Sequence, residues 1–167
     1  VNSLAAYGEI FFRNVRASGV IPQISIILGP CAGGAVYSPA ITDFVFMVEG
    51  PSQMFITGPE VIKEVTQEVI DINSLGGTDV NQSGSGVVHF KAMDEKDVFE
   101  QVRSLLSYLP SNNLIAPPAS EALDDPARPT PELDQIVPAQ ADEPYDIQQV
   151  IASLVDEREF LEVQEDY

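Results

Sequence analysis

The strongest constraint on the fold of this chain is an apolar run that ends in a glycine-rich turn. Residues 24–28 are apolar apart from one serine, and residues 29–35 read Gly-Pro-Cys-Ala-Gly-Gly-Ala. An apolar run bounded by glycine predicts a buried strand. The small residues after the glycines predict a helix start, where several backbone N–H groups lack intrahelical partners. The sequence therefore predicts a strand, a turn and a helix N-terminus in direct succession.

Two interpretations of the glycine turn are open from these residues alone. Because Gly33 and Gly34 carry no Cβ, a ligand oxygen can come within hydrogen-bonding distance of their amides. Such a site suits a phosphate, a carboxylate or an enolate oxygen. The same glycines also fit a purely structural role, in close packing or at a positive φ. The turn is not a Walker loop, because no Lys-Ser or Lys-Thr follows it, and its spacing differs from that of the dinucleotide-binding motif.

Short apolar runs and helical stretches alternate along the first two thirds of the chain. The spacing predicts a first helix that Asn2 or Ser3 caps and Gly19 ends. We expect strands at residues 24–28, 44–48, 54–56 and 87–90, a helix at 60–66, a loop at 73–86, and a helix that Asp94 opens and Pro110 ends. The last helix has a stripe expected to face the core, Val98, Val102, Leu105, Leu106 and Leu109. This alternation indicates an α/β fold.

The amino-acid composition of the chain changes after residue 113. Seven of the residues between 114 and 144 are proline and acidic side chains recur there, so this stretch is expected to be an extended linker. Beyond it, Asp146 is expected to cap a helix, and Gln149 completes a capping-box pattern. Residues 159–163 alternate between polar and apolar side chains, which predicts the beginning of a strand.

Composition excludes several classes of function. The net charge is −18, and it divides into −4 for residues 1–93 (eight acidic, four basic) and −14 for residues 94–167 (eighteen acidic, four basic). A chain this acidic is not expected to bind nucleic acid. The acid excess fits a solvated surface, and with only three lysines it also suits a high-salt cytoplasm.

The sequence also predicts no disulfide bond, no metal site and no membrane-spanning segment. One cysteine and one histidine leave no disulfide framework, cysteine-based zinc site or imidazole cluster, so we expect no metal. The first residue is Val1, no signal peptide opens the chain, and no apolar run is long enough to span a membrane. We expect a soluble intracellular protein that is a piece of a longer one.

Several segments together resemble a known family. They are residues 19–25, 29–43, 55–59, 75–77 and 155–160, and they are similar to the carboxyltransferase β chain of biotin-dependent acyl-CoA carboxylases, above all the propionyl-CoA carboxylases. The resemblance implies an α/β, crotonase-like (ClpP/crotonase) spiral of ββα units, present in part. Residues 1–113 would be the later part of a first domain, 114–144 an acidic linker rich in proline, and 145–167 the start of a second such domain.

The resemblance also implies a reaction. A carboxyl group would move from carboxybiotin to the α-carbon of a short-chain acyl-CoA (propionyl-CoA or acetyl-CoA) through a thioester enolate. The backbone N–H groups of Gly33 and Gly34 would form the oxyanion hole, and Ala32 and Ala35 would line the substrate. Biotin itself would accept the α-proton. This chain has no Met-Lys-Met biotinylation site, so biotin would arrive on a biotin carboxyl carrier that acts with a biotin carboxylase.

Further expectations follow from the family. It assembles as a hexamer in the cytoplasm or the mitochondrial matrix. Parts of both domains that the reaction needs are absent, so this segment alone is expected to be inactive. Residues 78–83 differ from the His- or Ser-Thr-rich stretch that often follows the Leu-Gly-Gly segment in the family, which leaves their contact with CoA open.

Alternatives and secondary candidates remain. One alternative is the carboxyltransferase subunit of a sodium-pumping decarboxylase, which runs the same chemistry in reverse; another is a non-enzymatic acidic interaction module. Cys31 lacks an evident partner base and is interpreted as a small buried residue rather than a nucleophile. His89 is interpreted as a hydrogen-bonded group beside a strand. Tyr37 and Ser38 are interpreted as helix packing.

Overall fold

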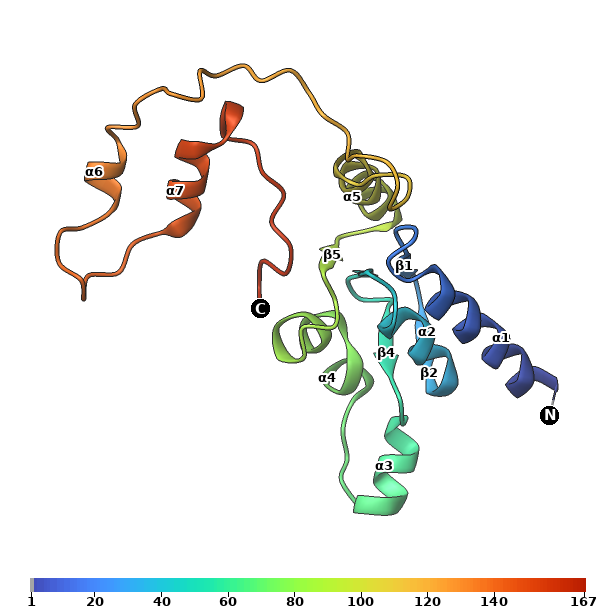
Figure 1. The fold of residues 1–167 in the computed structure, drawn as a ribbon. Helices are drawn as coiled ribbons and strands as arrows, with labels where there is room; N and C mark the ends of the chain where they lie inside the picture. The colour runs from blue at the N-terminus through green and yellow to red at the C-terminus, as the bar shows by residue number, and fades with distance from the viewer. Residues whose placement is uncertain (1) are drawn as a thin grey trace. The chain divides into compact units, whose positions relative to one another are not determined.

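The computed structural model describes residues 2–167, with side chains described from Ala5 onward (Figure 1). The cap predicted at Asn2 or Ser3 therefore lies outside the described side chains. The chain divides into two compact units. One contains the residues up to Pro118 together with Val163–Tyr167, and the other is Ala119–Glu162.

The strands of the first unit alternate between two parallel sheets. β1 (Ile24–Ile27), β3 (Phe44–Val48) and β5 (Phe90–Ala92) form one sheet in the order β1-β3-β5. β2 (Pro30–Ala32) and β4 (Gln53–Phe55) form the other. The first two turns of the chain thus each add one strand to each sheet before a helix follows, and the third turn adds β5 before α5. This arrangement is a spiral of ββα units.

A helix follows each turn of the spiral. The 3-10 helix Gly33–Val36 and α2 (Tyr37–Ala40) follow β2, α3 (Pro59–Thr66) follows β4, and α5 (Glu95–Tyr108) follows β5. α1 (Asn2–Ala17) precedes β1. α3 starts at Pro59, where the missing N–H costs little, and the Asp94 carboxylate accepts the Asp97 N–H at 2.8 Å to cap α5.

The core lies around the central strand, β3. Its Phe46 and Met47 are fully buried, and the Phe46 ring stacks on Phe90 with centroids 4.5 Å apart. Four successive residues of β3 are buried, so both faces of this parallel strand are covered, which explains the unbroken apolar run. The buried Ser52 hydroxyl donates to the Ile27 carbonyl at 2.6 Å and accepts the Val48 N–H at 3.2 Å. This serine therefore joins β1 to the end of β3.

Some sequence expectations for the first unit are wrong. Residues 30–32, expected within a turn, form β2, because they pair with β4 in the register Cys31↔Met54. The loop expected at 73–86 contains α4 (Ile72–Gly76) and a π-helix, Val80–Gly84, and Asp71 caps α4 by accepting the Asn73 and Ser74 N–H groups. The strand expected at 87–90 begins at Phe90. On α5, Val98 and Leu105 are buried as expected, but Leu106 is exposed.

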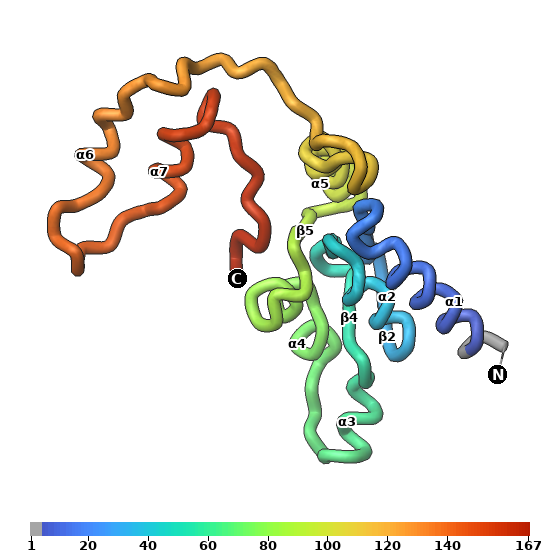
Figure 2. The backbone as a smooth tube through the Cα atoms, viewed as in Figure 1, coloured from blue at the N-terminus to red at the C-terminus, as the bar shows by residue number. Residues whose placement is uncertain are grey.

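The second unit, Ala119–Glu162, is mostly irregular. Figure 2 shows its backbone, in orange and red, running without regular structure up to α6 (Leu133–Ile136). As predicted, Asp146 caps α7 (Ile147–Leu154) by accepting the Gln148 N–H at 2.9 Å. The capping box predicted with Gln149 is wrong, because the Gln149 side-chain amide donates to the Asp146 carboxylate at 3.1 Å instead of accepting the Asp146 backbone N–H.

One side chain, that of Arg128, links the two ends of this unit. The Arg128 guanidinium lies 2.6 Å from the Asp124 carboxylate and donates to the Ser153 carbonyl at 2.8 Å. The prediction of a strand at 159–163 is wrong, because these residues have irregular backbone after the 3-10 turn Asp156–Arg158. The three-part division at residues 113 and 144 stays a prediction.

Candidate oxyanion site at the glycine turn

The glycine turn begins where β2 ends. Ala32 has extended backbone (φ −134°, ψ 154°), and Gly33 then turns the chain into the 3-10 helix with a φ of +63°. A residue with a Cβ in this left-handed conformation would cost about 1–2 kcal/mol. No side chain caps the 3-10 helix. Its first N–H groups therefore receive no side-chain acceptor from the described side chains.

Space is left beside the second glycine. A Cβ built on Gly34 would meet no atom within 4 Å, whereas one on Gly33 would lie 4.0 Å from the Ile56 carbonyl oxygen. Gly34 and Ala32 are exposed, and Gly33 and Ala35 are half-buried. An external oxygen therefore has room to approach the Gly34 side of the turn.

The turn is anchored although one side is open. Val36, the last residue of the 3-10 helix, is buried in the core cluster with Ile27 and Met54. On the other side, the register Ala32↔Phe55 ties the end of β2 to β4. Donors fixed in this way need little reorganisation when a charge develops beside them, which is the property of an oxyanion hole.

Tyr37 and Ser38 contact α1, as predicted. The Tyr37 ring meets the Phe11 ring edge-on, with centroids 6.2 Å apart and planes at 88°. The Ser38 hydroxyl donates to Asn14 Oδ1 at 2.9 Å, and Asn14 Nδ2 donates to Gln23 Oε1 at 2.9 Å. These contacts pack α2 against α1, so Tyr37 and Ser38 have a structural role.

Cys31 and His89 are occupied in structural roles. Cys31 is partly buried against the core cluster, and burial raises the pKa of its thiol, which disfavours the nucleophilic thiolate. His89 Nδ1 accepts the Val45 N–H at 3.0 Å, and burial lowers the pKa of the imidazole. An acceptor nitrogen must be unprotonated, so both observations describe a neutral imidazole. The interpretation of His89 as a hydrogen-bonded group beside a strand is confirmed.

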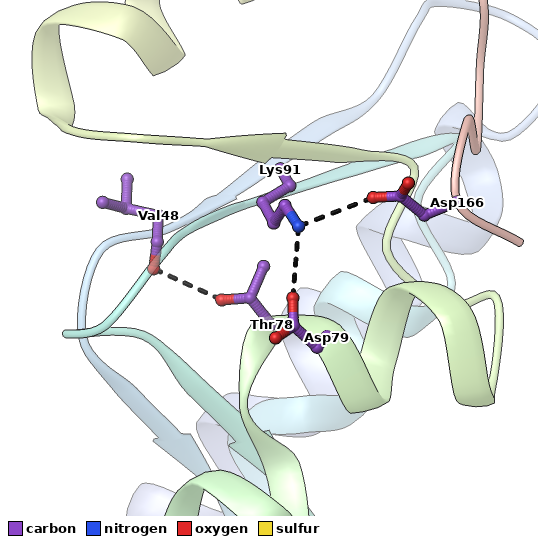
Figure 3. Close-up of polar contacts among 5 residues, drawn as sticks. All are labelled: Val48, Thr78, Asp79, Lys91 and Asp166. Carbon is purple, nitrogen blue, oxygen red and sulfur yellow. Dashed lines mark hydrogen bonds and ion pairs between the residues drawn. The ribbon is translucent and has the colours of Figure 1, made fainter.

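The segment after Gly76 and Gly77 contacts two strands of the three-stranded sheet, and no local pattern in the sequence predicts these contacts. Figure 3 shows the Thr78 hydroxyl directed at the Val48 carbonyl (3.5 Å) and the Lys91 ammonium between two carboxylates. Lys91 Nζ lies 3.2 Å from Asp79 Oδ1 and 3.5 Å from Asp166 Oδ2, and the hydrogen bond to Asp79 raises the pKa of the ammonium.

Two further properties of the described part of the chain bear on function. Its His, Cys, Asp and Glu side chains nowhere gather in a group of three or more that could hold a metal ion. Across residues 2–167, every helix is too short or too polar to cross a lipid bilayer.

Parallel strands that alternate between two sheets, with an open glycine turn after the first pair, define a crotonase-like α/β chain. The chain belongs to the carboxyl transferase domain family, whose sequence profile matches residues 1–167. The resemblance read from the sequence and the crotonase-like fold expected from it are both confirmed.

Three relatives illustrate the likeness. The propionyl-CoA carboxylase carboxyltransferase subunit of Haloferax mediterranei is 56% identical over 167 residues, which are 100% of this chain and 32% of that protein. The methylmalonyl-CoA decarboxylase subunit alpha of Veillonella parvula is 54% identical over the same length, which is 33% of that protein. Transcarboxylase 12S, solved with methylmalonyl-CoA and methylmalonic acid bound, superposes with a TM-score of 0.94 at 46% identity, over 99% of this chain and 32% of that one. The chain thus spans about a third of the length of its relatives.

Proposed function

We propose that this chain is part of a biotin-dependent carboxyltransferase that carboxylates a short-chain acyl-CoA at its α-carbon. The observation that carries the proposal is the anchored, open glycine turn in a chain 56% identical to a propionyl-CoA carboxylase carboxyltransferase subunit. Propionyl-CoA is the first substrate to test and acetyl-CoA the second.

The glycine turn would stabilise the enolate. Loss of the α-proton places negative charge on the thioester oxygen, and the N–H groups of Gly33 and Gly34 would donate hydrogen bonds to it. Losing one such donor typically costs about 2.7–4 kcal/mol of transition-state stabilisation. Ala32 and Ala35 flank the pair and would line the acyl-CoA, since small side chains leave the approach to the amides open.

Biotin would be the cofactor. Carboxybiotin, when bound, supplies the carboxyl group and the acceptor for the α-proton. The open side of Gly34 fits the oxygen of an acyl-CoA enolate, and we assign no residue of this segment to biotin. The proposed partners are a biotin carboxyl carrier, a biotin carboxylase and further copies of the chain in a hexamer, in the cytoplasm or the mitochondrial matrix.

A second candidate function is favoured by a specific observation. The Veillonella decarboxylase subunit is nearly as similar to this chain as the Haloferax carboxylase subunit, at 54% against 56% identity. A sodium-pumping decarboxylase would use the same enolate site in the opposite direction. Purification of the protein with a biotin carboxylase would support the first function, and purification with a multi-span membrane subunit would support the second.

The experiment uses a protein that carries this segment together with the rest of a carboxyltransferase chain. Methylmalonyl-CoA and free biotin are added, and loss of the carboxyl group is followed with and without biotin. Gly34→Pro removes one N–H donor. Biotin-dependent turnover that falls strongly in a still-folded variant would support both the reaction and the assigned site. Absence of turnover despite acyl-CoA binding would refute the proposed reaction.

A further inference from the structure

Asn81 lies at the centre of a buried group of backbone carbonyls. The residue is 9% exposed, and its Nδ2 lies 3.1 Å from the Met54 oxygen, 2.9 Å from the Gly76 oxygen and 3.1 Å from the Gly77 oxygen. Three acceptors around one side-chain atom require that atom to be the amide nitrogen. The side chain therefore connects β4 to the turn at Gly76 and Gly77.

One of these contacts completes the edge of a strand. Among the described residues, β4 pairs with β2 and with no other strand. The Met54 carbonyl is buried, and a buried carbonyl without a donor is costly. The Asn81 amide supplies that donor in place of a neighbouring strand. The backbone of Asn81 is fixed as well, because its carbonyl accepts the Val88 N–H at 3.0 Å and the Ser85 hydroxyl at 3.1 Å.

The two glycines allow the turn to come this close. A Cβ on Gly76 would overlap the Met54 carbonyl oxygen and lie 2.9 Å from the Phe55 ring, and a Cβ on Gly77 would lie 2.6 Å from the Asn73 oxygen. The backbone of the turn thus packs directly on β4, within reach of a side chain as short as asparagine. Thr78 and Asp79 bind the same turn to β3 and β5 of the other sheet (Figure 3).

The contacts continue from β4 to the oxyanion site. Met54 is the register partner of Cys31, and Phe55 is the partner of Ala32, the residue before Gly33. The Ile56 carbonyl then lies 4.0 Å from where a Gly33 Cβ would stand. A shift of β4 would therefore move β2, the strand that leads into the Gly33 and Gly34 amides.

We propose that Asn81 is a positioning residue for carboxyl transfer. Its amide fixes β4 against the Gly76–Gly77 turn, and β4 in turn fixes the N–H groups of Gly33 and Gly34. Asn81 acts through β4 and makes no contact with the substrate. This inference rests on the proposed function for its kinetic part, and its structural part is testable separately.

The test compares two variants of the complete protein. Asn81→Ala removes the donor, and Val98→Ala, on α5, removes buried apolar contacts away from β4. Both are compared with the unsubstituted protein for melting temperature, for kcat and KM of biotin-dependent methylmalonyl-CoA decarboxylation, and for hydrogen exchange of peptides covering residues 29–40 and 52–58. A displacement of about 1 Å at a reacting centre can cost about 100-fold in rate.

We expect Asn81→Ala to lower kcat by about 100-fold, to change the KM for the acyl-CoA far less, and to accelerate exchange in both peptides. Val98→Ala should have a lower melting temperature than the unsubstituted protein. It should keep most of the kcat, and hydrogen exchange in both peptides should be unchanged. The positioning role is wrong if Asn81→Ala keeps its kcat, or if Val98→Ala loses as much kcat at an equal loss of melting temperature. If the unsubstituted protein shows no turnover, the proposed function fails, and hydrogen exchange alone tests whether Asn81 positions β4. Faster exchange in both peptides of Asn81→Ala supports this role. Unchanged exchange refutes it.

Discussion

Alanine substitutions at the two glycines of the turn should separate stability from activity. Gly33 has a φ of +63°, so Gly33→Ala places a Cβ in left-handed backbone at a cost of about 1–2 kcal/mol. Removing a glycine also reduces the entropy of the unfolded chain, which returns about 0.4–1 kcal/mol. Gly33→Ala should therefore destabilise the protein by roughly 1 kcal/mol.

Gly34→Ala should behave in the opposite way. The new Cβ meets no atom of this chain within 4 Å, and Gly34 is not among the glycines with a positive φ. The stability should be unchanged or raised by about 0.4–1 kcal/mol. The methyl group would instead occupy space that the enolate oxygen needs, so kcat should fall by about 10²–10³-fold, the loss typical of a missing oxyanion donor.

The assay is biotin-dependent decarboxylation of methylmalonyl-CoA by the complete protein, with thermal unfolding measured in parallel. Gly29→Ala is the matched control, because Gly29 stands in the same segment, has no positive φ, and would place its Cβ in open space. It should keep both activity and stability. A Gly34→Ala protein that is stable and fully active would refute the assignment of the oxyanion site.

Three further outcomes are expected. Gly76→Ala should destabilise by about 1–3 kcal/mol, the range for overpacking, because its Cβ overlaps the Met54 carbonyl oxygen; thermal unfolding beside Gly29→Ala tests this, and equal melting temperatures would contradict it. His89 has a lowered folded pKa, so the unfolded chain binds more protons and stability should fall as the pH drops below about 6.5. His89→Asn, which offers an acceptor that does not titrate, should flatten this dependence in urea unfolding, and an unchanged slope would assign it to other groups. The net charge is −18, so the chain should become more stable as KCl approaches about 1 M, because the Debye length is then about 3 Å and repulsion between carboxylates is screened. A melting temperature that does not rise with KCl would argue against adaptation to high salt.

Local signals were enough for the elements whose ends are marked by single residues. The apolar runs at 24–28 and 44–48 contain β1 and β3, and β3 lies in the middle of its sheet, where a continuous apolar run is expected. Asp94 and Asp146 cap α5 and α7 by accepting N–H groups that lie two or three positions later in the sequence. Because both partners of each bond are close in sequence, these helix starts could be predicted from the sequence alone.

Elements held by distant contacts could not be predicted in this way. β2 has three residues, too few for a periodic pattern, and it exists through pairing with β4 about twenty positions later. Residues 73–86 have the composition of a loop, yet Asn81 and the Gly76–Gly77 backbone hold them against β4. In both cases the stabilising partner lies elsewhere in the sequence.

The same distinction applies to the candidate site. The sequence located Gly33 and Gly34, because a glycine pair between a strand and a helix is a local signal. It could not show that one side of Gly34 is open and that Val36 and β4 anchor the rest, since these depend on how the spiral brings its two sheets together. Nor could it show that Asn81, nearly fifty residues away, holds the strand beside the turn. A screen for loss of activity should therefore find sensitive positions along β4 and at residues 76–81 as well as at the glycines, and sensitivity confined to Gly33 and Gly34 would mean that the turn is rigid without β4.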